Sequence, residues 1–175
     1  MNNPPTFLSI IAFLVFLGSC SKKPVNSEEM RAYQRSQQFL TRWYLADIRG
    51  LPDTDEFNKF KSTLSSNLEN AFTSAINKNK SLKDNAKNLA EPIPWNEGDF
   101  LTGIWEHPNS FEIVEFSEEK NEAKVIFSYT YDLDADSHEQ KIITLHLVKN
   151  NGEWVVDNLF LDGDSLTDKL RRTMD

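Results

Sequence analysis

The chain has 175 residues with 19 basic and 27 acidic side chains, which give a formal net charge of −8 at pH 7. Residues 1–100 hold 12 basic and 11 acidic side chains (net +1), whereas residues 101–175 hold 7 and 16 (net −9). Because nucleic-acid binding requires a basic surface, this balance argues against a nucleic-acid partner. The acidic half either suits a cationic partner or is a well-solvated sheet face.

An uncharged apolar run lies near the amino terminus, at residues 7–17 (FLSIIAFLVFL), and the only cysteine of the chain, Cys20, follows it closely. A helix that spans a bilayer needs about 20 apolar residues, whereas the apolar part of a signal peptide has about 7 to 15. The run is therefore predicted to belong to a signal peptide. The preceding residues 1–6 (MNNPPT) carry no basic side chain, although signal peptides usually do.

The segment Leu17-Gly18-Ser19-Cys20 resembles the lipobox of bacterial lipoproteins, with a leucine three positions before the cysteine and two small residues between them. The resemblance implies cleavage after Ser19 and lipid on Cys20, with enough acyl chains for a permanent membrane anchor. It also implies a cell-envelope protein that faces the periplasm. Ser21 favours the outer membrane, because an aspartate there would suggest retention in the inner membrane. The alternative is an apolar first helix that holds a buried free cysteine.

We therefore predict a signal peptide at residues 1–19, a tether at 20–26 and a single domain at 27–175. Apolar residues at helical spacing predict three helices in the first part of this domain. The first begins at Asn26, which can form a capping box with Glu29, and runs to about Ile48. The second begins at Asp53 or Thr54. The third begins at Ser66, which is predicted to form a capping box with Glu69, and ends within residues 77–80, with one more short helix possible at 82–89.

Two prolines in Glu91-Pro92-Ile93-Pro94 exclude helix, and the pattern beyond them alternates. Strands are predicted at residues 111–116, 124–131, 141–149 and 154–161, with a short one around 99–105. Asn151-Gly152 predicts a tight hairpin, and Ser165 with Asp168 can cap a tail helix. Helices followed by antiparallel strands predict an α+β fold, in which the amino-terminal helices cover one face of the sheet.

Three segments occur in a characteristic order: residues 39–45 (FLTRWYL), 98–103 (GDFLTG) and 152–158 (GEWVVDN). Together they resemble a family of bacterial secreted domains of unknown function with the nuclear-transport-factor-2-like (cystatin-like) fold, over about residues 28–163. The resemblance implies a cone, in which helices close one side of a curved antiparallel sheet around a pocket. It implies no agreed activity.

Enzymes with this fold resemble one another in placing an Asp, Tyr or His in the pocket as a general acid or base. The candidates are His146, in the middle of a strand, and Asp157, on the last strand. Strict alternation predicts that Asp157 and Asn158 point to opposite faces, so that only one of them enters a pocket. A lone histidine on a strand is more often a packed or surface residue than a catalyst, and no nucleophile elbow, phosphate loop or Rossmann fingerprint is present.

Asp132, Asp134 and Asp136 alternate along the chain and are candidate metal ligands. A calcium-binding EF-hand loop would have Gly at its sixth position and Glu at its twelfth, where this chain has Ser137 and Ile143. A solvated β-turn is predicted there instead of a metal site. A single cysteine excludes multi-thiolate zinc, and no cofactor is predicted.

Trp95 and Trp105 lie outside the helical stripes, so they are candidates for a binding surface or a pocket mouth, or they plug the open end of the cone. The leading hypothesis is a lipid-anchored, non-enzymatic binding or accessory protein that holds a protein partner or a small ligand on the periplasmic side. The alternative is a small-molecule enzyme with His146 or Asp157 as base. A further alternative is a periplasmic immunity lipoprotein that neutralises a cationic toxin.

Overall fold

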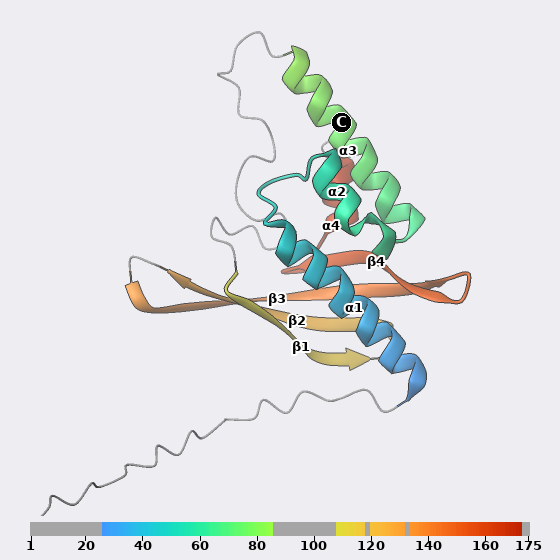
Figure 1. Ribbon diagram of the computed structural model, residues 1–175, viewed down its shortest axis with the longest axis vertical. Coiled ribbons are helices and arrows are strands. Elements are labelled where there is room, and N and C mark those ends of the chain that lie inside the picture. The colour runs from blue at the N-terminus through green and yellow to red at the C-terminus, as the bar shows by residue number, and fades with distance from the viewer. Residues whose placement is uncertain (1–25, 86–107, 118–119, 132–133, 173–175) are drawn as a thin grey trace, which may run out of the picture.

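The computed structural model describes residues 26–85, 108–117, 120–131 and 134–172 (Figure 1). The predicted signal peptide and most of the tether, with Cys20, lie outside these ranges, as do Trp95, Trp105, Asp132 and the short strand predicted around 99–105. Within the described ranges, no helix is both long and apolar enough to cross a membrane.

Helix α1 (Ser27–Ala46) begins as its capping box predicts. The Asn26 side chain accepts the backbone N–H of Glu28 at 2.9 Å and of Glu29 at 2.8 Å, and the Glu29 carboxylate accepts the Asn26 N–H at 3.4 Å. The helix ends at Ala46, two residues before the predicted Ile48, because Asp47 adopts the left-handed conformation (φ 48°) that closes a helix.

Helix α2 (Thr54–Phe60) begins as predicted, with Asp53 and Glu56 in a capping box, and a 3-10 turn, η1 (Lys61–Thr63), follows it. Helix α3 (Ser66–Asn85) is capped by Ser65 rather than Ser66, since Ser65 Oγ accepts the Leu68 N–H at 3.2 Å. The helix continues through residues 77–80, where an end was predicted. Those residues are polar, but none is Gly or Pro, and Asn and Lys cost a helix only about 0.7 kcal/mol each or less.

Five strands form one antiparallel sheet in chain order: β1 (Ser110–Ser117), β2 (Glu122–Tyr131), β3 (Asp134–Asn150), β4 (Glu153–Leu161) and β5 (Asp164–Ser165). Helix α4 (Leu166–Arg172) ends the described chain, and Ser165 Oγ accepts the Asp168 N–H at 3.2 Å, as the tail cap predicts. The α+β prediction is therefore confirmed at the level of helices followed by an antiparallel sheet.

The β3–β4 hairpin turns at Asn151 (φ 52°) and Gly152 (φ 83°), the two positive φ angles that a type I′ turn requires. The β2–β3 connection differs from its prediction. Residues 134–137 belong to β3 rather than to a solvated turn, because β2 continues to Tyr131, which pairs with Asp134. The predicted turn across Asp134 and Asp136 is therefore wrong.

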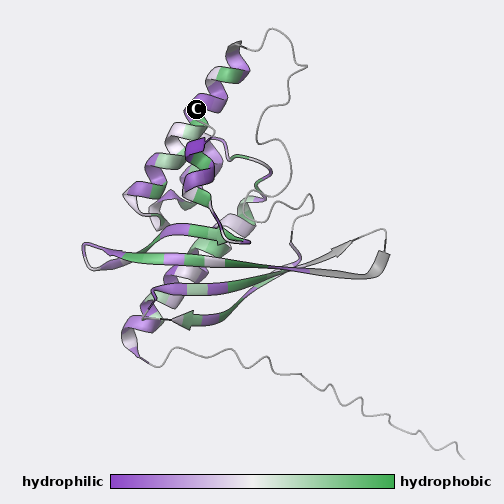
Figure 2. Cartoon of the chain, turned by 180° about the vertical axis from the view of Figure 1, so that it is seen from behind, coloured by the Kyte–Doolittle hydropathy of each residue, from purple (hydrophilic) through white to green (hydrophobic). Residues whose placement is uncertain are grey.

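Helix α1 crosses one face of the sheet, and α2 and α3 lie beyond the β4 side (Figure 1). Five aromatic side chains fill the space where these helices meet, with ring centroids 5.0 to 6.2 Å apart: Phe39, Trp43, Phe57, Phe60 and Phe72. The sheet adds alternate buried residues such as Val125, Ile143 and Leu145 to this core. From behind, the strands lie in front of α1, and none of the described helices crosses that side (Figure 2).

Candidate functional site

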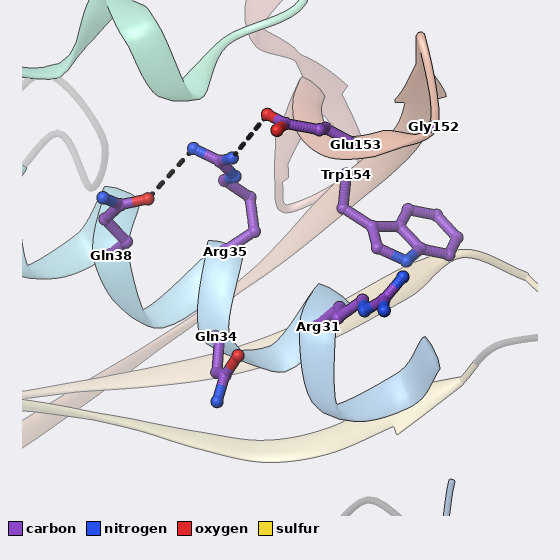
Figure 3. A pocket seen from close by; sticks show the side chains of 7 residues that line it. All are labelled: Arg31, Gln34, Arg35, Gln38, Gly152, Glu153 and Trp154. Carbon is purple, nitrogen blue, oxygen red and sulfur yellow. Dashed lines mark hydrogen bonds and ion pairs between the residues drawn. The ribbon is translucent and has the colours of Figure 1, made fainter. Parts of the chain in front are cut away.

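The carboxyl side of the β3–β4 turn and the first part of α1 border an open hollow of about 550 Å³. On the helix, two arginines and two glutamines repeat at a spacing of four residues, which places each pair on one side of α1. On the hairpin, the tight Asn151-Gly152 turn sets the position of the next two side chains. The lining residues are Arg31, Gln34, Arg35 and Gln38 from α1, and Gly152, Glu153 and Trp154 from the hairpin (Figure 3).

Trp154 is the buried member of this set, with 6% of its surface exposed. The ammonium group of Lys149 lies 5.0 Å from the centroid of its ring. Its indole Nε1 is buried and has no hydrogen-bond partner among the described residues. A buried donor without an acceptor costs about 1–3 kcal/mol, so an acceptor atom that reached the Trp154 N–H would be favoured there.

Glu28, in the first turn of α1, holds the cations next to Trp154. Its carboxylate lies 2.6 Å from Lys149 Nζ and 3.1 Å from Arg31 Nη1. The hydrogen bond from Lys149, followed by the charges of Lys149 and Arg31, holds the pKa of Glu28 below its ordinary value, against the opposing effect of desolvation. The Trp154 indole adds a small effect of the same sign, although its Nε1 does not reach a hydrogen bond of good geometry. The positive charge of Lys149 is therefore already compensated by the Glu28 carboxylate.

Arg35 is held less firmly. Its guanidinium donates to Gln38 Oε1 at 2.9 Å and lies 3.4 Å from Glu153 Oε2 (Figure 3). The Arg35 side chain is 20% exposed, but that of Glu153 is 76% exposed. Ion pairs with such an exposed partner contribute about 0–1 kcal/mol. The Glu153 carboxylate can therefore be exchanged for a carboxylate or phosphate of a ligand at little cost.

A β-bulge brings the two predicted catalytic candidates together on the sheet. His146 pairs with Asn158 and Leu147 pairs with Val156, so Asp157 is an extra residue in β4. Asp157 and Asn158 therefore both oppose His146, so the unbroken alternation that the prediction of opposite faces assumed does not hold at this point of β4. His146 Nδ1 lies 3.8 Å from Asp157 Oδ2, beyond hydrogen-bond distance.

Ser65 is the third member of this cluster with His146 and Asp157, and its hydrogen bonds hold the fold together. Its hydroxyl donates to Asp157 Oδ1 at 2.6 Å and accepts the Leu68 N–H, while its own N–H donates to the Val156 carbonyl at 2.8 Å. In a Ser-His-Asp triad the histidine lies between the other two and takes the serine proton. Here the aspartate lies between, so the cluster ties the start of α3 to β4, and neither His146 nor Asp157 lines the α1–hairpin hollow.

The remaining predicted site residues are not brought together by the described structure. Cys20, Trp95, Trp105 and Asp132 lie outside it, and for Asp134 and Asp136 it gives only a place in β3. No group of three potential metal ligands occurs in the part of the chain that is described. The sequence prediction missed Arg31 and Arg35, because a polar helix face looks the same whether it binds a ligand or water; their spacing of four was the one available signal.

Comparison with known proteins gives no family. No family model matches the sequence, and no curated protein matches it significantly. Among solved structures, the crystal structure of a protein of unknown function from Bacteroides thetaiotaomicron VPI-5482 is similar over 76% of this chain and 91% of that one. The two chains are 11% identical, with a TM-score of 0.44, and a similarity of this size carries no conclusion about fold family or function.

Proposed function

We propose that this chain is a lipid-anchored protein of the bacterial cell envelope that binds a protein partner or a small ligand on the periplasmic side, without catalysis. The observation that carries binding is the α1–hairpin hollow, where Arg35 has only a weak exposed partner and the buried Trp154 Nε1 has none among the described residues. Attachment to the membrane, with the outer membrane favoured, is supported by the lipobox-like Leu17–Cys20 segment.

We also propose that the domain is nuclear-transport-factor-2-like. The support is the order of the elements, in which three helices precede a single antiparallel sheet and α1 crosses one face of it. Because aromatic side chains fill the space where α1, α2 and α3 meet, the proposed binding site lies outside that space, between α1 and the β3–β4 hairpin.

No observation favours the enzymatic alternative, because neither His146 nor Asp157 lines the α1–hairpin hollow and the Asp157 carboxylate already accepts the Ser65 hydroxyl. A periplasmic immunity lipoprotein is a narrower form of the same proposal. Linkage of the gene to a toxin gene would distinguish that form from a general accessory protein.

Metabolic labelling with an alkyne analogue of palmitate, followed by membrane fractionation, tests the anchor. The full chain is expected to carry label and to sediment with membranes, whereas the Cys20→Ser variant is expected to lose both properties. If the variant stays labelled and membrane-bound, the proposed anchor is wrong. Crosslinking in the intact envelope tests partner binding, and failure to retrieve any reproducible partner or ligand would count against a binding role.

A further inference from the structure

The α1–hairpin hollow has many more hydrogen-bond donors than acceptors. Each arginine side chain of the lining carries five N–H groups and each glutamine amide two. Among the lining residues that the structure describes, Glu153 supplies the only carboxylate. A ligand that complements this surface is therefore rich in acceptor oxygens.

The charges around the hollow favour an anion. Arg31, Arg35 and Lys149 face Glu28 and Glu153, a local sum of +1 in a chain whose net charge is −8. Glu28 is already bound by Lys149 and Arg31, while the exposed Glu153 is the weak partner of Arg35. An incoming oxyanion would take the place of Glu153, because a planar guanidinium can bind two of its oxygens at once.

The burial of Trp154 argues against a neutral sugar as the occupant. Sugar sites commonly offer an open aromatic face, but the Trp154 ring is only 6% exposed and is covered by Lys149. Only its N–H is left without a partner among the described residues, and an N–H requires an acceptor atom. The volume of about 550 Å³ is large enough for a small anion or a lipid headgroup.

The hollow lies near the proposed anchor in the sequence, which favours membrane lipids as a source of the anion. Residues 21–26 lie between Cys20 and the start of α1 at Ser27, which is seven residues further along the chain. Seven residues span at most about 25 Å when fully extended. Arg31 lies four residues further on, about 6 Å along the helix axis. The β3–β4 hairpin lies near the same end of α1 (Figure 1). An anchored domain therefore carries this hollow close to the phospholipid headgroups.

We infer that the hollow between α1 and the β3–β4 hairpin binds a phosphate group, with Arg35 and Arg31 as its cationic ligands. The inference rests on the proposed function as a binding protein and names the ligand class of that site. A phosphate of this kind can come from a phospholipid headgroup or from a free phosphate compound, and the two sources share the same chemistry.

Titration of the full chain, purified from membranes in a non-ionic detergent, tests the inference. The probes are inorganic phosphate, the short-chain lipid dihexanoyl phosphatidylglycerol below its micelle concentration, and the zwitterionic dihexanoyl phosphatidylcholine. Heat of binding and tryptophan fluorescence are the readouts. We expect at least one of the two anionic probes to bind more tightly than the zwitterionic lipid. Binding of phosphatidylglycerol alone identifies a lipid headgroup, and binding of inorganic phosphate identifies a site open to free phosphate.

Substitutions separate this site from general attraction to charge. Arg35→Gln is expected to weaken binding of the anionic probe about tenfold or more, and Arg35→Lys to restore only part of it, because an ammonium cannot bind two oxygens in a fixed plane. Arg42→Gln is the matched control: it removes the same charge from α1, but Arg42 donates to Ser62 Oγ and is not part of this lining. Circular dichroism checks that each variant is folded.

Two results would overturn the inference: no binding of either anionic probe, or equal losses in Arg35→Gln and Arg42→Gln. These results are distinct from failure of the proposed anchor. A chain that binds phosphate but is not labelled through Cys20 would overturn the anchor alone. A chain that is labelled but binds neither anionic probe would overturn the phosphate site alone.

Discussion

Lys149 Nζ lies 2.6 Å from Glu28 Oε2, and this ion pair joins the end of β3 to the first turn of α1. The two residues are far apart in the sequence, so the contact helps to position the helix against the β3–β4 hairpin. The same lysine lies over the Trp154 ring. The ion pair therefore helps to set the shape of the proposed phosphate site, although Lys149 is not assigned as a ligand.

This pair predicts a loss of stability in acid. The pKa of Glu28 is lowered in the folded state from its ordinary 4.5, chiefly by Lys149. A carboxyl whose folded pKa is depressed stabilises the fold above its unfolded pKa, and that contribution is lost as the pH falls from about 4.5 through the folded pKa. Urea unfolding at pH 7 and pH 3 measures the effect. Glu28→Gln should show a smaller decrease between the two pH values than the unchanged chain, and equal decreases would contradict the prediction.

Ser65→Ala is expected to destabilise the protein by about 1–2 kcal/mol, the usual cost of a lost helix cap. The reason is that Ser65 Oγ both accepts the Leu68 N–H and donates to Asp157. Ser66→Ala is the matched control, because Ser66 is exposed and is not the cap; its effect should stay within about 0.5 kcal/mol. Denaturant midpoints measure both, and equal losses would mean that Ser65 has no special role.

Local features of this fold were predictable because they depend on neighbours in the sequence. The capping boxes of Asn26 and Asp53 join a side chain to backbone groups two or three residues away. The Asn151-Gly152 turn requires only two residues that tolerate positive φ. Apolar alternation likewise predicted four strands, since each buries one face. The ends of elements were predicted less well. Helix α3 runs past a polar stretch that contains no helix breaker, and β3 begins earlier than predicted because β2 supplies a partner strand.

The candidate site was not predictable because it depends on residues that are far apart in the sequence. Arg35 meets Glu153 across 118 residues of sequence, and no local pattern encodes that approach. The β4 bulge at Asp157 depends on how β3 and β4 pair, whereas alternation assumes a regular ladder. Trp154 entered the prediction as the first residue of a strand and as part of a segment that resembles a family, but not as a site residue. Its missing acceptor became visible once the surrounding side chains were in place.

Gly152→Ala is expected to cost about 1–2 kcal/mol of stability through backbone strain alone. Gly152 has φ 83°, a conformation that side chains disfavour, yet a Cβ atom there would meet nothing within 4 Å. Denaturant unfolding should therefore show a lower midpoint with an unchanged slope, as expected for a folded state of the same compactness. An unchanged midpoint would show that the hairpin relaxes to another turn type. In that case the position of Glu153 and Trp154, and with it phosphate binding, should change too.

Trp154→Phe isolates the indole N–H that has no partner among the described residues. The substitution keeps an aromatic ring under Lys149 but removes the donor. Loss of packing and relief of an unsatisfied buried donor oppose each other, each on the order of 1–3 kcal/mol, so we expect little net change in unfolding free energy.

The phosphate affinity of Trp154→Phe is the decisive measurement. Arg31, whose side chain is 67% exposed and lies beside the indole in Figure 3, can swing from Glu28 toward a bound anion and so uncover the indole N–H. We therefore expect the phosphate affinity to decrease several-fold in Trp154→Phe. If this variant keeps full affinity while Arg35→Gln loses it, the arginines alone bind the anion and the indole N–H does not contribute.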